Sequence, residues 1–163
     1  PYEYEFHLLS DEKTIYAFAL PGGQIFITYA LFSQLENEDQ LAGVLGHEIG
    51  HVIGRHSAER SAETEFWQGM ATAGSVGADV GGIVQQYGQG KLLKNGRGDE
   101  LESDDLGVLF MIESGYNPEE MIGVMEILKK AAGPNRVPEF QSTHPDPDNR
   151  IEKIQEAIER HSK

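Results

Sequence analysis

The sequence predicts a single α+β domain over residues 1–163, mostly helical and with a small antiparallel β-sheet near the N-terminus. Two observations predict this fold class. Apolar residues alternate with polar ones at the start of the chain, at the period of a half-buried strand. From Asn37 onward, apolar residues recur at the helical period. The length suits one hydrophobic core, and no internal repeat indicates a second unit.

About three short segments are expected to form the sheet. The first is residues 2–8, where aromatic and aliphatic side chains alternate with charged ones. A second β-rich run, residues 14–20, meets the turn signal Pro21–Gly23, and Gln24–Thr28 then resumes the strand pattern. This last strand either presents an open edge to which an extended peptide can add, or its edge is covered like that of an ordinary sheet strand.

A helix is expected to begin after Asn37, a good N-cap with acidic residues in the first turn and Gln40 as its capping-box partner. Residues 61–98 are rich in glycine and small side chains, so helix with irregular breaks is expected there. The glycines of residues 69–90 either belong to a mobile cover over a cleft or allow helices to pack closely.

The last third of the chain contains three further helix signals. A helix is expected over residues 99–114, with its end at Gly115. Asn117–Pro118 is a favourable start for the next helix, which Gly133–Pro134 ends. Asp146–Pro147 begins a final amphipathic helix.

The composition excludes several classes of function. The chain has 27 acidic and 13 basic side chains, a formal charge of −14 at pH 7. Phosphate surfaces are bound by excess Lys and Arg, so no nucleic-acid partner is expected. Without cysteine, the chain forms no disulfide, thiolate zinc site or Cys nucleophile. No apolar run approaches the roughly 18 residues of a membrane span. Because the chain begins at Pro1 rather than Met, we expect it to be trimmed.

The segment His47–His51 carries the pattern His-Glu-x-x-His. Residues four apart share a helix face, so the two imidazoles can bind one ion at about 2.0–2.1 Å each. Glu48 is rotated by about 100° from His47, too far for an easy bond to the ion but near enough to hold a water molecule whose pKa the ion lowers. The alternative is a structural helix with two surface histidines, although apolar neighbours make unpartnered imidazoles costly.

A zinc hydrolase needs a third ligand. His56 comes five residues after His51, about 140° round the helix, and is interpreted as a surface or core histidine and not as a ligand. The acidic cluster 99–105 is a better source, because Glu100 and Asp104 share a helix face. One of these carboxylates can bind the ion while the other accepts the outer N–H of a ligating histidine. The alternative is a solvated acidic helix N-terminus.

These residues resemble the gluzincin metallopeptidases, the family that includes HtpX, the CAAX prenyl protease and BepA-like periplasmic quality-control proteases. The resemblance rests on His47–His51, on the Glu-x-x-x-Asp pattern of Glu100 and Asp104, on residues 17–28, and on Ser142–Pro145 with Arg150. It implies a zincin-like fold with one Zn²⁺ per chain, and it assigns roles to matching residues: His47, His51 and Glu100 as metal ligands, Glu48 as the catalytic base, and Asp104 as the partner of a ligand. It also implies a polypeptide substrate and the bacterial periplasm or cell envelope as the location.

His144 precedes Pro145, which restricts its backbone to extended conformations. The resemblance implies that His144 stabilises the oxyanion of the tetrahedral intermediate. Two alternatives stay open: His144 enters the fourth coordination position and inhibits the enzyme, or it is a loop histidine that caps the last helix. Arg150 is expected to pair with an acidic group, either structurally or beside the site.

The sequence therefore predicts a zinc metalloendopeptidase that hydrolyses peptide bonds of extended or misfolded polypeptides, as in envelope protein quality control. One rival is a self-inhibited or non-proteolytic zinc-binding module with a chaperone-like role. The other is a structural helical domain without metal. The sequence predicts neither the cleavage preference nor the oligomeric state.

Overall fold

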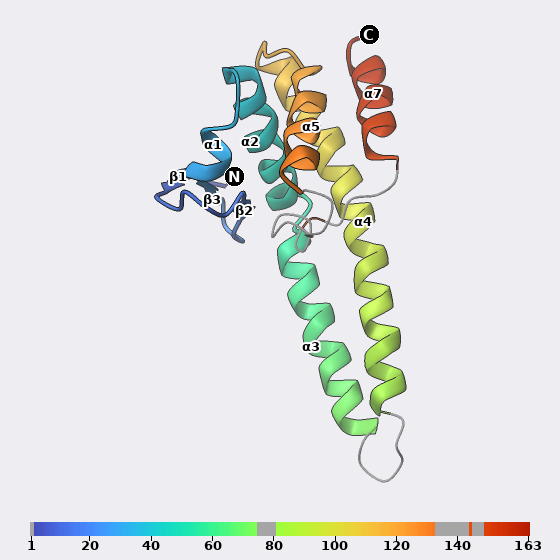
Figure 1. Ribbon diagram of the computed structural model, residues 1–163. Coiled ribbons are helices and arrows are strands. Elements are labelled where there is room, and N and C mark those ends of the chain that lie inside the picture. The colour runs from blue at the N-terminus through green and yellow to red at the C-terminus, as the bar shows by residue number, and fades with distance from the viewer. Residues whose placement is uncertain (1, 75–80, 133–143, 145–148) are drawn as a thin grey trace.

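The computed structural model describes residues 2–74, 81–132, 144 and 149–163. It confirms the predicted fold class, a mostly helical domain with a small sheet at the N-terminus (Figure 1). The elements in chain order are β1 (Glu5–Leu9), β2 (Ala17–Ala19), β3 (Gln24–Thr28), α1 (Tyr29–Phe32), α2 (Glu38–Ile53), α3 (His56–Gly74), α4 (Gly81–Glu113), α5 (Glu120–Ala132) and α7 (Arg150–His161).

The sheet has three strands in the order β1-β3-β2. β2 pairs with β3 in antiparallel fashion, but β1 pairs with β3 in parallel, so the sheet is mixed and not purely antiparallel as expected. The reason is the path of residues 10–16, which connect β1 to β2 across the position that β3 occupies. The tight hairpin after β2 then places β3 between the two earlier strands. Because β3 is central, the structure excludes the open edge and supports the other alternative for Gln24–Thr28, a strand with covered edges; the outer strands are β1 and β2.

One face of the sheet packs towards the helices. Ala17, Ile25 and Ile27 are buried on this face. Ala17 and Ile27 belong to the first of two apolar clusters, in which the sheet meets α1, α2 and α5. The second cluster joins α4, α5 and α7 around Val108, Met111, Met121, Ile154 and Ile158. The long α2 helix lies between these clusters, and it therefore holds its side chains in a rigid setting.

The predicted start of α2 is confirmed, because Asn37 is its N-cap and accepts a hydrogen bond from the backbone N–H of Gln40. α4 begins at Gly81, well before the predicted residue 99. α5 begins at Glu120, after a turn at residues 118–119, and α7 begins at Arg150. The signals at Gly133–Pro134 and Asp146–Pro147 lie outside the described residues.

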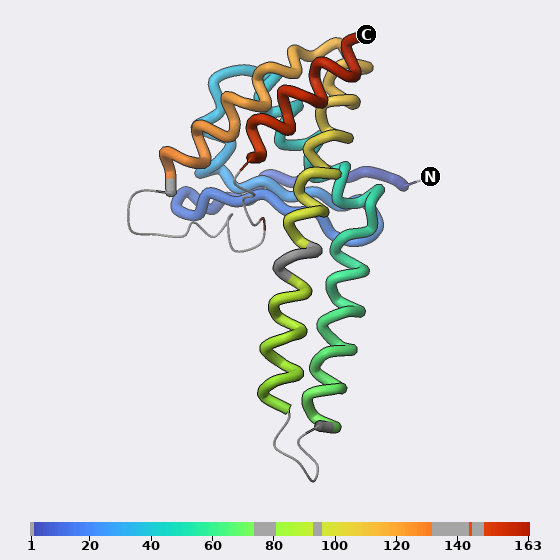
Figure 2. Tube along the Cα trace, turned by 90° about the vertical axis from the view of Figure 1, so that its right-hand side faces the viewer, coloured from blue at the N-terminus to red at the C-terminus, as the bar shows by residue number. Residues whose placement is uncertain are grey.

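α3 and the first part of α4 lie side by side and extend together away from the sheet and the other helices (Figures 1 and 2). The glycines in this hairpin play unequal roles. At Gly88 a Cβ atom would lie 2.6 Å from Cγ of Trp67, so close helix packing is found there. Gly69, Gly82 and Gly90 have open space around them. None of the helices described combines the length and the apolar character that crossing a membrane requires.

Candidate metal centre

The site forms where α2 and α4 approach each other at backbone distance. A Cβ atom on Gly50 would lie 2.8 Å from Cα of Ser103, and one on Gly46 would lie 3.2 Å from Cα of Gly107. Such contacts leave room for no side chain at Gly46 or Gly50. The close approach brings Glu100, one turn before Ser103, over the histidines of α2.

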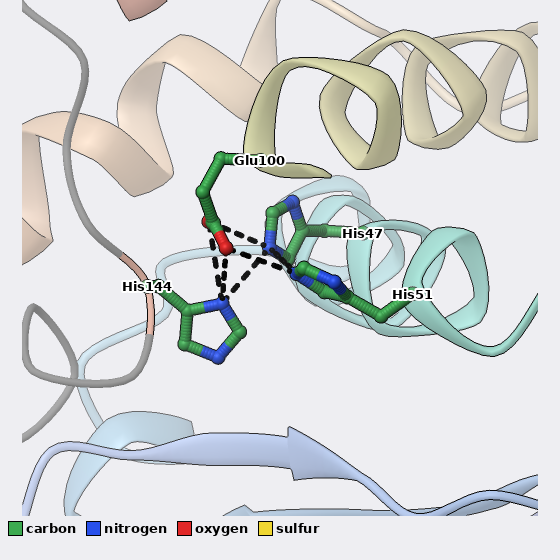
Figure 3. Close-up of side chains that lie close together, drawn as sticks. All are labelled: His47, His51, Glu100 and His144. Carbon is green, nitrogen blue, oxygen red and sulfur yellow. Dashed lines mark hydrogen bonds and ion pairs between the residues drawn. The ribbon is translucent and has the colours of Figure 1, made fainter. Parts of the chain in front are cut away.

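Four side chains from separate parts of the chain converge at this crossing (Figure 3). Nε2 of His47 lies 3.0 Å from Nε2 of His51. The carboxylate oxygens of Glu100 lie 3.4 Å and 3.2 Å from these two nitrogens. Nδ1 of His144 lies 3.1 Å from the Glu100 carboxylate and 3.4 Å from Nε2 of His47. All four residues are buried.

The arrangement fits a tetrahedrally coordinated metal ion. Ligand atoms at about 2.0–2.2 Å from a tetrahedral ion are separated from one another by about 3.3–3.6 Å. The separations given above, 3.0–3.4 Å, are close to that value, and the four ligand atoms all lie within 4.8 Å of one another. Imidazole nitrogens with one carboxylate are a donor set typical of zinc. His47, His51, Glu100 and His144 are therefore able to hold a zinc ion.

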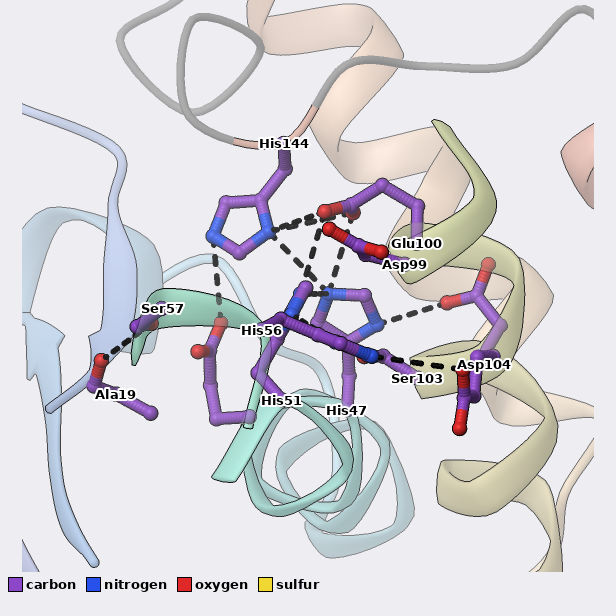
Figure 4. Close-up of polar contacts among 12 residues, drawn as sticks. Ala19, His47, His51, His56, Ser57, Asp99, Glu100, Ser103, Asp104 and His144 are labelled. Carbon is purple, nitrogen blue, oxygen red and sulfur yellow. Dashed lines mark hydrogen bonds and ion pairs between the residues drawn. The ribbon is translucent and has the colours of Figure 1, made fainter. Parts of the chain in front are cut away.

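Asp104 and Arg150 lie directly behind this group. Nδ1 of His47 lies 2.8 Å from Oδ1 of Asp104 (Figure 4), and Nε of Arg150 donates to Oδ2 at 2.6 Å. Nη1 of Arg150 also lies 3.3 Å from the Glu100 carboxylate. Burial alone would raise the pKa of the Asp104 carboxyl, but the charge of Arg150 and the hydrogen bond to His47 hold it below its ordinary value. Asp104 is thus a charged acceptor for the outer nitrogen of His47.

The two histidines of α2 differ in their affinity for a proton. Burial favours the neutral form of His47, but hydrogen bonds to Asp104 and Glu100 outweigh it and raise the pKa of His47 to about 9. For His51, burial dominates and lowers the pKa to about 3. Burial also raises the pKa of Glu100, yet hydrogen bonds to the three histidines bring it well below its ordinary value. In the metal-free protein, the ionised Glu100 therefore faces one cationic and one neutral ring from α2.

The comparisons with known proteins agree with this geometry. The family model for peptidase family M48 matches residues 1–158. The chain belongs to peptidase family M48. The gluzincin resemblance and the enzyme class predicted from the sequence, a zinc metalloendopeptidase, are thereby confirmed at the level of the family.

Two relatives illustrate the range of this M48 group. The chain is 33% identical over 157 residues to mitochondrial metalloendopeptidase OMA1 of Schizosaccharomyces pombe, covering 94% of this chain and 46% of the relative. It is also 33% identical over 165 residues to the β-barrel assembly-enhancing protease of Yersinia pestis, covering 91% of this chain and 33% of the relative. The chain thus spans between a third and a half of the length of these relatives.

Glu48 of this M48 domain lies at a cleft beside the four-residue group. Its side chain is buried, neither carboxylate oxygen has a hydrogen-bond partner among the described residues, and Oε1 lies 3.6 Å from Nε2 of His144. Burial raises the pKa of its carboxyl. A buried carboxylate without donors is costly unless something polar fills the space it faces, as water or a substrate does at an active site. The cleft has a volume of about 600 Å³, and its walls come from β2 with its flanks and from α3: Tyr16, Phe18, Ala19, Leu20, Pro21, Ser57, Arg60, Ser61, Thr64 and Glu65.

His56, interpreted from the sequence as a surface or core histidine, lies next to the group and is not one of its four members. Its ring is buried, and its Nδ1 lies 2.9 Å from Nδ1 of His51 and 3.2 Å from Oγ of Ser103. Sequence reasoning missed this contact, because a continuous helix would place His56 on another side from His51. The signal was Gly54, a residue at which a helix commonly ends.

Proposed function

We propose that the chain is the catalytic domain of a zinc-dependent endopeptidase that cleaves extended or misfolded polypeptides. The observation that carries the proposal is the buried Glu48 carboxylate, to which no described residue donates a hydrogen bond, beside four convergent metal-ligand atoms. His47, His51 and Glu100 would hold one Zn²⁺. When bound there, zinc polarises the substrate carbonyl and lowers the pKa of water. Glu48 takes the proton of the attacking water and passes it to the leaving amine. Asp104 orients His47, and Arg150 keeps Asp104 ionised.

The outer edge of β2 supports the choice of extended chains as substrates. On either side of β2, Leu20 donates to the carbonyl of Gln24, and the carbonyl of Tyr16 accepts from Thr28. The backbone groups of even-numbered residues therefore face β3. The alternation of an antiparallel pair then turns the backbone groups of Ala17 and Ala19 away from β3. Ser57 occupies one of these groups, with its Oγ 3.5 Å from the Ala19 carbonyl (Figure 4). Ala17 is completely buried and Ala19 is half-buried, so an extended peptide can add to this edge at Ala19 through main-chain hydrogen bonds, which select little for side chains.

A proline substitution tests this edge. Ala19→Pro removes one outward N–H without breaking a bond to β3, whereas Ala19→Val keeps that N–H. We expect Ala19→Pro to raise KM for an unfolded substrate with little change in zinc content. Equal KM values for the two variants would refute substrate addition to β2.

The position of His144 favours a self-inhibited resting form of the same enzyme. Its Nδ1 stands at the fourth corner of the donor group, the place that catalysis requires for water and substrate. In this form His144 competes with water for the ion and leaves when substrate enters. The alternative role, oxyanion stabilisation, would use Nε2, which lies 3.6 Å from Glu48. His144→Ala separates the two: higher peptidase activity supports self-inhibition, and lower activity supports the catalytic role.

The proposed function is tested with casein and metal analysis. Glu48→Gln should retain zinc, and its peptidase activity should fall about 10²–10⁴-fold, because the substitution removes the base but no ligand. His47→Ala should lose both zinc and activity. Glu126→Gln, an exposed glutamate of α5, is the matched control and should match the wild type. Equal activity of the wild type and Glu48→Gln refutes the catalytic assignment, and a wild type without zinc supports a structural domain.

We further propose a role in protein quality control of the bacterial periplasm or cell envelope. The Yersinia pestis relative is named for β-barrel assembly, and single-chain barrels of bacteria lie in the outer membrane. The Schizosaccharomyces pombe relative is named as mitochondrial, which is the competing location. Fractionation of cells that express the full-length protein tests this: recovery with periplasmic markers supports the proposal, and recovery with cytosolic markers contradicts it.

A further inference from the structure

We propose that His56 is a positioning residue for the metal centre, whose ring accepts a hydrogen bond from His51 and thereby fixes the tautomer and orientation of that ligand. The inference rests on the proposed function in one respect, that His51 binds a metal ion. It concerns the side of His51 that faces away from the ion, for which neither the sequence pattern nor the family match assigns a partner.

The chain folds back between α2 and α3 to place this ring. α2 ends at Ile53 with Gly54 as its C-cap, and Arg55 has a φ of 60°, in the left-handed region that residues other than glycine seldom adopt. This turn brings His56 back beneath the end of α2, where its ring meets that of His51 edge-on at 83°, with the centroids 5.1 Å apart. A Cβ atom at residue 54 would lie 2.3 Å from Nε2 of His56. The absence of a side chain at Gly54 thus makes space for the His56 ring.

The protons on the two rings follow from the geometry. His51 points Nε2 at the donor group, 3.0 Å from Nε2 of His47 and 3.2 Å from Glu100, so Nε2 must keep its lone pair free to bind the ion. Neutral His51 then carries its proton on Nδ1. Only one hydrogen fits between the two Nδ1 atoms at 2.9 Å, so His56 is the acceptor and carries its own proton on Nε2. Nε2 of His56 lies 3.6 Å from the Glu102 carboxylate, which stabilises that tautomer.

The partner of His51 differs in charge from the partner of His47. His47 meets the Asp104 carboxylate, whose negative charge is compensated by Arg150. A second carboxylate at residue 56 would add a buried negative charge close to Glu100 without such a cation, at a cost in desolvation. A neutral imidazole accepts the same hydrogen bond without that cost. His56 therefore orients His51 while leaving the charge of the site unchanged.

A simpler reading is that His56 only fills space between the end of α2 and α4. Asparagine and leucine have nearly the same shape, and Oδ1 of asparagine corresponds in position to Nδ1 of histidine. His56→Asn keeps an acceptor opposite His51, and His56→Leu removes it. A space-filling role predicts that both variants behave alike, or that leucine is better tolerated in this buried place.

The test measures zinc affinity of the purified full chain by chelator competition, together with the thermal stability of each metal-free protein. We expect His56→Leu to lower zinc affinity by about 10–100-fold, the usual effect of losing such a partner. His56→Asn should stay within about threefold of the wild type. The absorption spectrum of the cobalt-substituted protein should change in the leucine variant and be restored in the asparagine variant, a readout that packing alone would not move.

Three outcomes overturn the inference: wild-type zinc affinity in His56→Leu, equal losses in both variants, or losses that follow the metal-free stabilities. If His56→Leu does not fold, His56→Asn decides alone, and loss of its zinc affinity refutes the proposal. Failure of the proposed function is distinguishable, because then the wild type itself would not bind zinc.

Discussion

The two halves of α4 differ in how deeply they are buried and in what they pack against. Residues 99–113 cross α2 and bury Glu100, Ser103 and Asp104 in the core of the molecule. Residues 81–98 run along α3 in the projecting hairpin and leave Ile83 69% and Tyr87 66% exposed. In the first region the contacts fix the positions of charged groups, and in the second the helix is held mainly by one neighbour. Substitutions should therefore have large effects near the site and small effects in the hairpin.

The largest effect on stability is expected for Arg150, whose guanidinium compensates two buried carboxylates of residues 99–113, the site half of α4. Arg150→Met takes the guanidinium away from both buried carboxylates, which should lower the free energy of unfolding of the metal-free protein by about 3–5 kcal/mol. Arg160→Met on the same helix, α7, removes an exposed pair with Asp105 and should cost less than about 1 kcal/mol. Urea unfolding measures both, and similar losses would erase the distinction between buried and exposed charges.

A smaller effect is expected for Gly107, in the site half of α4. A Cβ atom there would lie 3.0 Å from the backbone nitrogen of His47 and 2.9 Å from Cε of Met121. Gly107→Ala should therefore cost about 1–3 kcal/mol by overpacking and should also weaken zinc binding, because the two helices must separate. Urea unfolding and chelator competition test the two parts. Loss of stability with unchanged zinc affinity would show that the ligand positions tolerate this separation.

Proton release on zinc binding tests the charges assigned to the site half. The raised pKa of His47, about 9, means that its ring is cationic at pH 7.5 in the metal-free protein. That charge stabilises the metal-free fold fully below pH 6.5, and the stabilisation is lost as the pH rises through about 9. Zinc needs the neutral ring, so binding at pH 7.5 should release about one proton. Calorimetry in buffers of different ionisation enthalpy measures it; heats independent of the buffer at pH 7.5 would contradict the assignment.

The smallest effect, and one of opposite sign, is expected for Gly90 in the hairpin half. Open space surrounds its Cα, so no contact opposes a methyl group. Gly90→Ala should stabilise the protein by about 1 kcal/mol or less through helix propensity. The two Gly→Ala substitutions on one helix thus form a matched pair with opposite signs. A loss of stability in Gly90→Ala, seen by thermal unfolding, would show that the hairpin half is packed more closely than its contacts indicate.

Local sequence patterns were sufficient to predict where α2 begins. They also grouped four residues into one predicted metal site: His47, His51, Glu100 and Asp104. N-cap chemistry and the four-residue helical period depend only on near neighbours, so sequence reasoning captures them. The strand segments were also recognisable, but their order was not. Whether β1 lies beside β2 or beside β3 depends on the path of residues 10–16, which no strand pattern contains.

Two further differences between the predicted and the observed structure also arise from tertiary contacts. α4 begins at Gly81 although glycines disfavour helix by about 1 kcal/mol each, because packing against α3, including the contact of Gly88 with Trp67, supports it. His56 reaches His51 because Arg55 adopts a left-handed conformation. A helical period extended through that turn therefore points the His56 side chain in the wrong direction.

The small residues at the crossing of α2 and α4 also decide which carboxylate meets the histidines. Glu100 and Asp104 are separated by one turn of α4, about 6 Å, so a slide of one turn would bring Asp104 to the place of Glu100. That slide would set Met111 opposite Gly46, where Gly107 now touches the backbone of α2. Packing at this crossing therefore disfavours the one-turn slide, so the alignment that places Glu100 at the histidines does not depend on a metal ion.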